Sequence, residues 1–366
     1  MITDFVLPIG IAMLVFLISI LIPMVYSGQH VKTFEYRWNR VVKPTIGGFF
    51  FFLSILVWLL WVFSTLDSKQ DVFRIAWLGV ASLMAFLVGW LDDRFGTAPL
   101  PKLIGQVLVA FFLIAGNWIM PLFDNKFVDS LITIVWIVAL QNAFNFFDNM
   151  DGVTGIVSLI IFLFMIFTPV DLTYKFMYIL VSFALLGFLF HNFPPSRIYM
   201  GDKGSLLLGT IASISPILLC QSGCDNLGWM EKLLLFTAFI GLPAIDIVLV
   251  IIHRICRRTP PWVGGTDHLS HSLHSLLGSE RKVVIALAIL QTIFVVSSGI
   301  ALRVGSTIFI TLTLIMWMAL FLIMFIIHWR YVPEPYNSLC YKHTTGKMPS
   351  WLRRLLMRCG SHPASL

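Results

Sequence analysis

The stretch that decides the fold is residues 128–152, which read VDSLITIVWIVALQNAFNFFDNMDG. Residues 128–146 form a mostly apolar run close to the ~20 residues that a helix needs to cross a bilayer. Similar runs recur along the chain, and 58% of its 366 residues are hydrophobic while only 12% are charged. Average soluble domains carry about 25% charged residues. The composition therefore excludes an ordinary soluble enzyme and a disordered chain, and it predicts an all-α polytopic membrane protein.

We count about eleven apolar runs of membrane-spanning length. Their approximate bounds are 5–26, 45–65, 73–91, 103–123, 128–146, 153–170, 175–191, 204–220, 233–253, 283–302 and 305–328. Residues 1–328 are thus predicted to be one membrane domain, because no segment between the runs is long enough to bury a core of its own. Residues 329–366 form a basic tail. Its residues 351–358 could form a short helix that lies on the lipid surface, or could be a frayed end.

Basic residues are distributed unevenly between the predicted loops. With the N-terminus placed outside, the cytoplasmic loops hold 19 of the 25 lysines and arginines, and the external loops hold 6. The positive-inside rule then predicts an external N-terminus and a cytoplasmic C-terminus. The same bias accounts for most of the net charge of +7, so we expect no nucleic-acid partner.

The end of the 128–152 stretch carries a regular series of polar residues, Asn142, Asn145, Asp148 and Asp151. A step of three residues turns a helix by about 300°, so neighbouring members lie along one side of it. An aspartate at mid-bilayer costs about 2.5–3.5 kcal/mol, and helix capping would explain one such residue but not four. We therefore interpret the series as the polar wall of a cavity.

Two further acidic motifs fall on the predicted cytoplasmic side. Asp92 and Asp93 directly follow the third run, where adjacent carboxylates repel each other unless a cation lies nearby. They could bind a divalent metal or simply end a solvated helix. Asp202 lies between Gly201 and Gly204 at the start of the eighth run, where a helix N-terminus offers free N–H groups to an anion. It could also be a plain helix cap.

The longest predicted cytoplasmic loop, residues 254–282, combines arginines with a glycine- and histidine-rich turn. Arg254 opens it, and Asp267, His268 and His271 follow. Guanidinium groups suit phosphate recognition, and an acid inside an apolar run, here Asp246, is a candidate functional residue. Acids beside bases around a membrane-embedded cleft fit a diphosphate bridged by Mg²⁺, with a lipid as the other reactant.

The chain resembles the polyprenyl-phosphate N-acetylhexosamine-1-phosphate transferases, also called glycosyltransferase family 4. The resemblance runs from about residue 40 to 280 and rests on five ordered motifs. These are Pro44–Gly48 for PxxGG, Asp92-Asp93 with Lys102 and Gln106 for DD…K…Q, Asn142–Gly152 for NxxNxxDGxDG, Met200–Ser205 for MGDxGS, and Asp267–Leu273 for DHxSHRL.

The resemblance implies a reaction, a cofactor and partners. A polyprenyl phosphate oxygen would attack the β-phosphate of a UDP-N-acetylhexosamine, giving a polyprenyl-diphospho-sugar and UMP. Members that use undecaprenyl phosphate and UDP-GlcNAc, including those of O-antigen and lipopolysaccharide synthesis, match best. Mg²⁺ would be the cofactor, with Mn²⁺ as a substitute. The enzyme would lie in the bacterial inner membrane with its active site facing the cytoplasm, and it could form a homodimer.

The family motifs also imply site residues. Asp202 and Asn145 would bind the metal. Asp92 and Asp93 would bind metal or deprotonate the lipid phosphate, and Asp148 and Asp151 would be catalytic at the nucleotide site. The substrate-binding residues would be Lys43, Gly47, Gly48, Lys102, Asn142, Asn149, Arg254, Asp267, His268 and His271.

Two residues depart from the family motifs, and a third fills a position that varies within the family. Asn149 stands where glycine is commonest, Lys203 fills the variable slot of MGDxGS, and Ser272 replaces the arginine of DHxSHRL. Loss of that arginine weakens the predicted phosphate clamp unless Arg254 or a neighbouring arginine compensates.

Three other functions are open alternatives. A phospho-MurNAc-pentapeptide translocase would carry a histidine-triplet loop that this chain lacks. A CDP-alcohol phosphotransferase would continue its aspartate motif with an arginine, but Val153 follows Gly152 here. A transporter of anionic lipids would place its polar residues near the midplane, whereas these cluster at one face.

Overall fold

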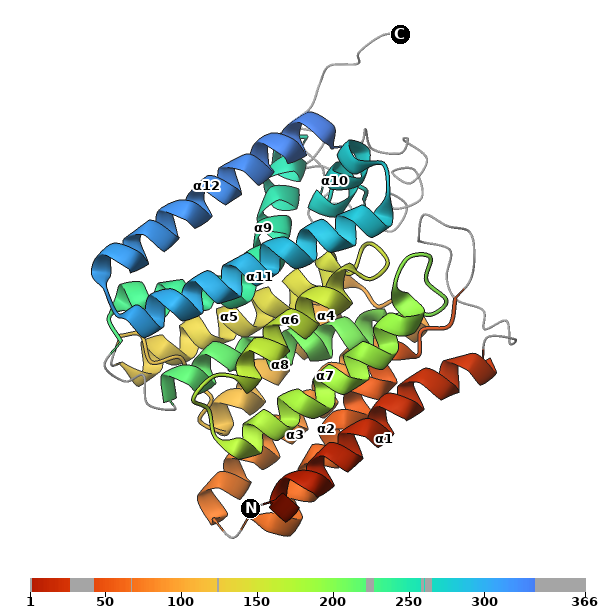
Figure 1. The fold of residues 1–366 in the computed structure, drawn as a ribbon, viewed down its shortest axis with the longest axis vertical. Coiled ribbons are helices and arrows are strands. Elements are labelled where there is room, and N and C mark those ends of the chain that lie inside the picture. Colours follow the sequence, from red (N-terminus) through yellow and green to blue (C-terminus); the bar gives the residue numbers. More distant parts are fainter. Residues whose placement is uncertain are drawn as a thin grey trace.

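A computed structural model describes residues 2–26, 43–66, 68–123, 125–221, 227–257, 260 and 265–332. Over these residues the chain folds into twelve α-helices (Figure 1). They are α1 (Ile2–Tyr26), α2 (Gly47–Thr65), α3 (Lys69–Phe95), α4 (Pro99–Ala115), α5 (Lys126–Phe147), α6 (Val153–Ile166), α7 (Leu172–Asn192), α8 (Gly201–Gln221), α9 (Trp229–Cys256), α10 (Leu269–Leu277), α11 (Glu280–Val304) and α12 (Thr307–Tyr331).

The protein is an all-α, multi-pass membrane protein. In the described part of the chain, seven helices are long and apolar enough to cross a membrane: α2, α3, α5, α7, α8, α11 and α12. The two segments of α9 meet at an angle of 81° and make an eighth candidate if they form one span. Each predicted apolar run coincides with a helix. However, α4, α6 and the apolar part of α1, Gly10–Met24, are shorter than a full span, so eleven crossings and the orientation of the termini stay predictions.

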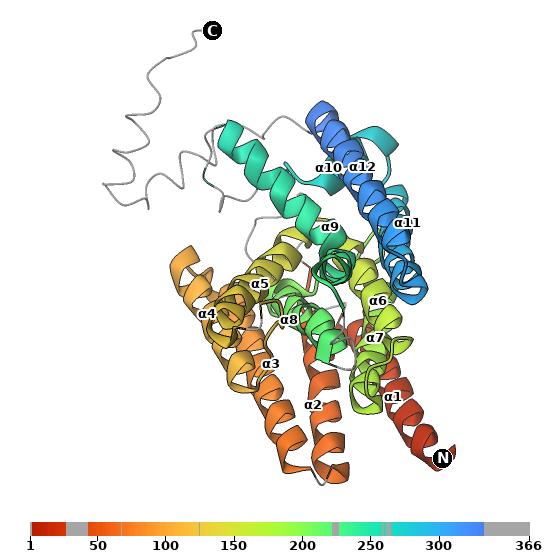
Figure 2. The same cartoon turned by 90° about the vertical axis from the view of Figure 1, so that its left-hand side faces the viewer.

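Helix α8 is the central element of the bundle, and nearly every residue from Gly201 to Cys220 is buried. It packs against α2, α3, α5, α6 and α9, and Figure 2 shows it enclosed by them. Small residues permit this close packing. A Cβ on Gly89 of α3 would lie 2.3 Å from the Lys203 backbone, and one on Gly209 would lie 2.9 Å from the Cα of Gln141 in α5. The start of α8 is therefore held firmly against α3.

The predicted PxxGG motif lies alongside the segment that precedes α8. Gly47 and Gly48 donate backbone hydrogen bonds to the carbonyls of Tyr199 and Met200 at 3.0 and 3.1 Å, and Tyr199 donates one to Pro44 at 2.9 Å. A Cβ on Gly48 would lie 2.7 Å from the Gly204 backbone nitrogen. Close packing therefore explains both glycines, and their predicted contact with substrate stays a prediction.

The polar series that ends α5 differs from the predicted single helical wall. Helix α5 ends at Phe147, Asp148 is its C-cap, and Gly152, with a φ of 79°, is the N-cap of α6. Only Asn142 and Asn145 therefore lie on the helix, while Asp151 belongs to the turn that follows. The chain must reverse direction here, and glycine tolerates the left-handed conformation that the turn requires.

Helices α9 and α12 both extend beyond the ends that the sequence predicted. Helix α9 continues through Arg254, and the predicted loop after it contains the short helix α10. Helix α12 continues past residue 328 to Tyr331. The predicted surface helix in the tail lies outside the described residues.

Candidate functional site

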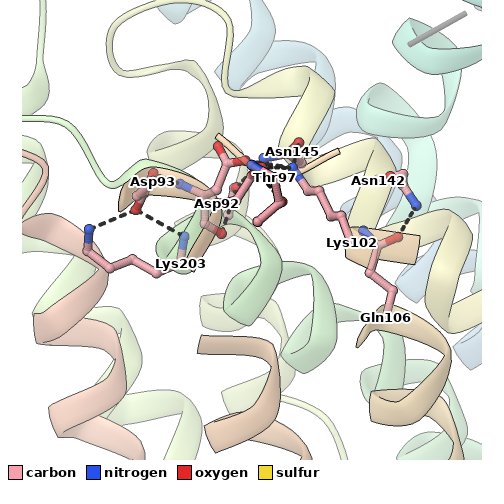
Figure 3. A network of polar contacts seen from close by, with 10 residues as sticks. Asp92, Asp93, Thr97, Lys102, Gln106, Asn142, Asn145 and Lys203 are labelled. Atoms are coloured by element: carbon pink, nitrogen blue, oxygen red, sulfur yellow. Dashed lines mark hydrogen bonds and ion pairs between the residues drawn. The ribbon is translucent and has the colours of Figure 1, made fainter. Parts of the chain in front are cut away.

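Three polar side chains from three helices meet around the ammonium group of Lys102 on a fourth helix, and we call these four residues the Lys102 cluster (Figure 3). Lys102 Nζ, at the start of α4, donates to Asp202 Oδ2 at 2.6 Å and to Asp92 Oδ2 at 2.7 Å. It also donates to Asn145 Oδ1 at 3.0 Å. Three oxygen atoms contributed by α3, α5 and α8 thus converge on a single point that a cation occupies.

The backbone turn after α3 fixes the Asp92 carboxylate. Thr97 donates to Asp92 Oδ1 from its backbone nitrogen at 2.8 Å and from its hydroxyl at 2.6 Å. These bonds direct the second carboxylate oxygen toward Lys102. The sequence reading did not identify Thr97, although a threonine just after a Gly96 helix end is a residue type that often forms such local bonds.

A hydrogen bond to Ser205 orients the Asn145 amide. Its Nδ2 donates to the Ser205 hydroxyl at 2.9 Å, which turns its Oδ1 toward Lys102. One turn earlier on α5, Asn142 donates from Nδ2 to Gln106 Oε1 at 2.9 Å. The predicted K…Q pair of α4 therefore meets the two asparagines of α5, as Figure 3 shows.

Asp93 has a different partner from Asp92. Its Oδ2 lies 2.7 Å from Lys203 Nζ, and its Oδ1 accepts the backbone N–H of Asp202 at 2.8 Å. Lys203 is only 3% exposed, donates to the Thr45 hydroxyl at 3.3 Å, and lies 5.3 Å from the centre of the Phe49 ring. The adjacent acids therefore pair with separate lysines, and Asp93 also caps α8. The sequence reading treated Lys203 as filling a variable slot and missed this role.

We expect Lys203→Met to lower the free energy of unfolding by about 3–5 kcal/mol, because removing one partner of a buried ion pair leaves the other charge uncompensated. The thermal unfolding midpoint of the purified protein measures this effect. Lys126→Met is the matched control, since Lys126 is exposed at the start of α5. Equal midpoints for the two variants would contradict a stabilising role for the Asp93–Lys203 pair.

A second group, the Asp151 cluster, joins the turn after α5 to the segment before α8. Asp151 Oδ2 accepts the Ser196 backbone N–H at 3.0 Å and lies 3.3 Å from Lys43 Nζ. Lys43 also donates to the Ser196 hydroxyl at 2.8 Å. Lys43 and Asp151, both predicted site residues, are thus direct partners. Ser196 was not predicted, because only the folded chain brings it to Asp151.

A third group, the histidine cluster, surrounds the start of α10. Asp246 of α9 is fully buried and accepts from His268 Nδ1 at 2.8 Å and from the Leu269 backbone N–H at 2.6 Å. Arg254 and Asp267 form a two-pronged ion pair with N–O distances of 2.7 and 2.8 Å. The intramembrane acid singled out in the sequence is therefore the residue that positions the predicted histidine motif.

The histidine cluster packs on the end of α5. The His268 ring lies edge-on to Phe146 at 6.4 Å between centres, and the Arg254 guanidinium lies 5.8 Å from the centre of the same ring. Ser270 donates a hydrogen bond to Asn149, the residue that departs from the family pattern. The end of α5 and its turn thus connect all three clusters, through Asn145, Asn149 and Asp151.

Local environment sets the charge of two groups in this cluster. Burial opposes ionisation of Asp267, but hydrogen bonds and the charge of Arg254 outweigh it and lower the pKa of this carboxyl. Burial lowers the pKa of His271 to about 4, and the neighbouring His268 acts in the same direction. At neutral pH, Asp267 is therefore a carboxylate and His271 a neutral imidazole.

The surroundings of Ser272, which stands where the family motif has an arginine, suit a small side chain. Ser272 is fully buried, and its hydroxyl lies 3.1 Å from His328 Nδ1 of α12. An arginine at this position would have to bury its charge against α12. Arg254 instead supplies a guanidinium to the histidine cluster, held in place by Asp267.

The Lys102 cluster is the part of the site whose chemistry fits a metal. No group of three or more His, Cys, Asp or Glu side chains that could hold a metal ion is found among the described residues. Mg²⁺, however, prefers oxygen ligands and usually takes only one or two protein carboxylates beside substrate phosphates. Asp92, Asp202 and the Asn145 amide oxygen provide that donor set, and they already surround a positive charge.

The chain is similar to known proteins over the segment that forms the Lys102 cluster. Residues 75–220 match the model of a family described as Glycosyl transferase family 4, and this stretch contains the whole Lys102 cluster. The chain is 26% identical over 298 residues to a probable undecaprenyl-phosphate N-acetylglucosaminyl 1-phosphate transferase of Bacillus subtilis, covering 77% of this chain and 79% of that protein.

Two other relatives are similarly distant. A phospho-N-acetylmuramoyl-pentapeptide-transferase of Lactobacillus johnsonii is 27% identical over 296 residues, covering 71% of this chain and 85% of that protein. An undecaprenyl-phosphate alpha-N-acetylglucosaminyl 1-phosphate transferase of Thermotoga maritima is 24% identical over 247 residues, covering 68% and 73% respectively.

Proposed function

Because this chain is a member of glycosyl transferase family 4 and a transferase of the phospho-sugar class, we propose that it transfers N-acetylhexosamine-1-phosphate from a UDP-sugar to a polyprenyl phosphate. GlcNAc-1-phosphate and undecaprenyl phosphate are the proposed donor group and acceptor, since two relatives are named for them. The products are UMP and a polyprenyl-diphospho-sugar, the first lipid-linked unit of a cell-surface glycan. Membership of a transferase family sets aside the transporter alternative.

The observation that carries this proposal is the convergence of Asp92, Asn145 and Asp202 on Lys102 Nζ. Phosphoryl transfer depends mainly on positioning and on stabilising the charge that develops on phosphate oxygens. A bound Mg²⁺ supplies such charge stabilisation. Asp202 and Asn145 are the residues proposed to hold it, with Asp92 beside them. Lys102 Nζ bonds to these same oxygens. A bound metal would take its place there, and the displaced ammonium could then contact a phosphate oxygen.

The acceptor does not require a strong general base. A phosphate monoester has a second pKa near 6, so it is mostly ionised at neutral pH. Asp93 is paired with Lys203 and caps α8, which supports a role in fixing the start of α8 beside the reacting groups. We therefore propose that Asp92 and Asp93 act mainly by positioning, with Asp92 next to the metal.

The remaining clusters are proposed to bind the donor. Asp148, the C-cap of α5, and Asp151, in the turn after it, are assigned to the nucleotide side, with Lys43 and Asn149 beside them. Arg254, His268 and His271 are assigned to the diphosphate. The Asp246 carboxylate orients the His268 ring, and a neutral His271 can donate one N–H to a phosphate oxygen.

The proposed location is the inner membrane of a bacterium, since the relatives described above are bacterial. The end of the bundle that carries the three clusters is proposed to face the cytoplasm, where UDP-sugars are made. In the predicted loop assignment, the loops on this side of the membrane hold 19 of the 25 lysines and arginines, which supports this orientation under the positive-inside rule.

The experiment uses purified protein, undecaprenyl phosphate, Mg²⁺ and a panel of UDP-sugars that includes UDP-GlcNAc and UDP-MurNAc-pentapeptide. We expect UMP release that requires the lipid, stops with EDTA, and returns with Mg²⁺ or Mn²⁺. UMP from UDP-GlcNAc alone supports the proposal, and UMP from UDP-MurNAc-pentapeptide alone supports the translocase alternative. UMP release that persists in EDTA would contradict the metal assignment.

A further inference from the structure

Helix α10 is short, and it carries the two histidines assigned above to the donor diphosphate. It has nine residues, Leu269–Leu277, with His268 as its N-cap and His271 in its first turn. Isolated helices of fewer than about 12 residues are marginal in water even in favourable sequences. Contacts with other helices must therefore decide where α10 lies and where His271 points. Figure 1 shows α10 beside the last turns of α12.

Besides the Asp246 contact, two hydroxyl groups tie the first turn of α10 to other elements. Ser270 donates to Asn149 Oδ1 in the turn after α5. The Ser272 hydroxyl lies 3.1 Å from Nδ1 of His328, in the last turn of α12. Because these two serines are two positions apart, they point to nearly opposite sides of the helix, about 200° from each other. Helix α10 is therefore held between the α5 turn and α12.

His271 lies between these two contacts along the helix. It is about 100° from Ser270 and from Ser272, so its side chain leaves α10 on a face that neither contact covers. The backbone N–H groups of His271 and Ser272 both donate to the His268 carbonyl at 3.1 Å. A rotation of α10 about its axis would break both hydroxyl contacts and redirect His271 at the same time. The two contacts therefore fix the direction of this imidazole.

The hydrogen bonding of His328 favours a role beyond packing. The Ser272 hydroxyl donates its one hydrogen to the His268 carbonyl at 3.2 Å, so His328 Nδ1 is the donor to the Ser272 oxygen. His328 is 1% exposed, and its Nε2 has no hydrogen-bond partner among the described residues. Burying a polar atom without a partner costs free energy. A leucine would fill this position at lower cost, so the bond to α10 is what the imidazole adds there.

Neighbouring rings fix the His328 imidazole in place. It meets the His253 ring of α9 nearly at right angles, with 5.4 Å between ring centres. The His253 ring in turn packs edge-on against Trp329 of α12, with 5.8 Å between centres. Close packing of this kind restricts a buried side chain to one rotamer. His328 Nδ1 therefore stays directed at α10.

We propose that Asn149 and His328 are positioning residues of the transfer reaction. His328 acts through Ser272 and Asn149 acts through Ser270, and together they hold α10 so that His271 faces the diphosphate of the UDP-sugar. Both departures from the family motifs, Asn149 and Ser272, thus take part in holding one helix. This inference rests on the proposed function, and it assigns a role to α12, which lies beyond the sequence motifs.

The first test separates donor binding from the other steps. His328→Leu should raise the KM for the UDP-sugar by about 5-fold, the effect of one lost hydrogen bond, while kcat and the KM for undecaprenyl phosphate stay within about 2-fold. His328→Asn should restore the wild-type KM, because asparagine carries an N–H donor two bonds from Cβ, as histidine does at Nδ1. Trp317→Phe is the matched control. It removes a hydrogen bond from α12 to Ser297 of α11, about three turns before His328.

Double-mutant cycles test whether each contact acts as a unit. Asn149→Ala, Ser270→Ala and the double variant should raise the donor KM equally, since all three lose the same contact. Ser272→Ala and His328→Leu should behave in the same way, and Ser272→Ala decides if His328→Leu does not fold. An effect of Asn149→Ala that Ser270→Ala does not reproduce would mean that Asn149 contacts the substrate directly. That result, or additive effects of Ser272→Ala and His328→Leu, would overturn the inference.

Hydrogen–deuterium exchange measures how firmly α10 is held, without any catalysis. Amides of residues 269–277 should exchange about 5-fold faster in His328→Leu than in wild type, because the lost bond lowers the free energy of local opening. The exchange rate should return to the wild-type value in His328→Asn. Amides of α8 should exchange at the wild-type rate in both variants.

The results separate this inference from the proposed function. Wild-type donor KM and exchange rates in a folded, active His328→Leu would overturn the inference and leave the proposed function standing. Faster exchange of α10 with an unchanged donor KM would show that the contact serves only the fold, which also overturns the inference. A wild-type protein that releases no UMP would count against the proposed function. The dissociation constant of the UDP-sugar would then replace its KM, with the same 5-fold weakening expected in His328→Leu and recovery in His328→Asn, each about as large as one hydrogen bond allows.

Discussion

Asp202→Asn should lower lipid-dependent UMP release by at least about 100-fold while the protein stays folded. The substitution keeps the size of the side chain but removes the charge that lies 2.6 Å from Lys102 Nζ, at the point where a metal is proposed to bind. Losing one electrostatic contact to a developing oxyanion typically costs 10²–10³ in rate, and loss of a metal-binding carboxylate should cost no less. The measurement is UMP release at saturating UDP-sugar and lipid.

Asp171→Asn is the matched control for this variant. Asp171 caps α7 by accepting the Thr173 backbone N–H, and asparagine caps helices as well as aspartate does. It should retain wild-type activity. If Asp202→Asn kept more than about a tenth of wild-type activity with unchanged Mg²⁺ dependence, the assignment of Asp202 to the metal would be wrong.

Asp246→Ala should lower the free energy of unfolding by about 3–5 kcal/mol, as much as Lys203→Met. Asp246 is 0% exposed and accepts hydrogen bonds from His268 Nδ1 and the Leu269 backbone. Alanine leaves both donors buried without an acceptor, and it frees the start of α10. The thermal unfolding midpoint measures the effect, with Asp71→Ala at the exposed start of α3 as control.

Asp246→Asn separates stability from function. Asparagine can still accept from the Leu269 N–H, so the protein should fold, but it cannot supply the charge that orients the His268 ring. We expect a higher KM for the UDP-sugar with a smaller loss of stability than in Asp246→Ala. Wild-type kinetics in Asp246→Asn would show that the Asp246–His268 contact serves only the fold.

The helices were predictable because an apolar run of about 20 residues inside a membrane must satisfy its own backbone hydrogen bonds, and few structures other than a helix do so. The positions of all eleven runs agree with helices, including those around Asp92 and Asn145. The number of crossings was less predictable. Helix α4 ends at Ala115, where Gly116 and Asn117, with a φ of 61°, begin a turn, and α6 ends at Ile166, three residues before Pro169. These local helix breakers lie inside the predicted runs, whose bounds followed hydrophobicity alone.

The candidate site was predictable as a set of residues but not as a set of contacts. Motif spacing identified Asp92, Asn145 and Asp202, which meet in the fold. It did not indicate that Lys102 lies between them, or that Lys203 pairs with Asp93, 110 positions away in the sequence. Such pairs depend on the angles and positions at which α3, α4, α5 and α8 pack against one another. Hydrophobic periodicity carries no information about these packing angles.

The central claim is that a sugar phosphate, rather than a sugar alone, moves to the lipid. Mass spectrometry of the lipid product and chromatography of the released nucleotide test it in one reaction. We predict a polyprenyl phosphate that gains one N-acetylhexosamine and one phosphate, together with an equal amount of UMP. A lipid that gains only the sugar, with release of UDP, would contradict the account.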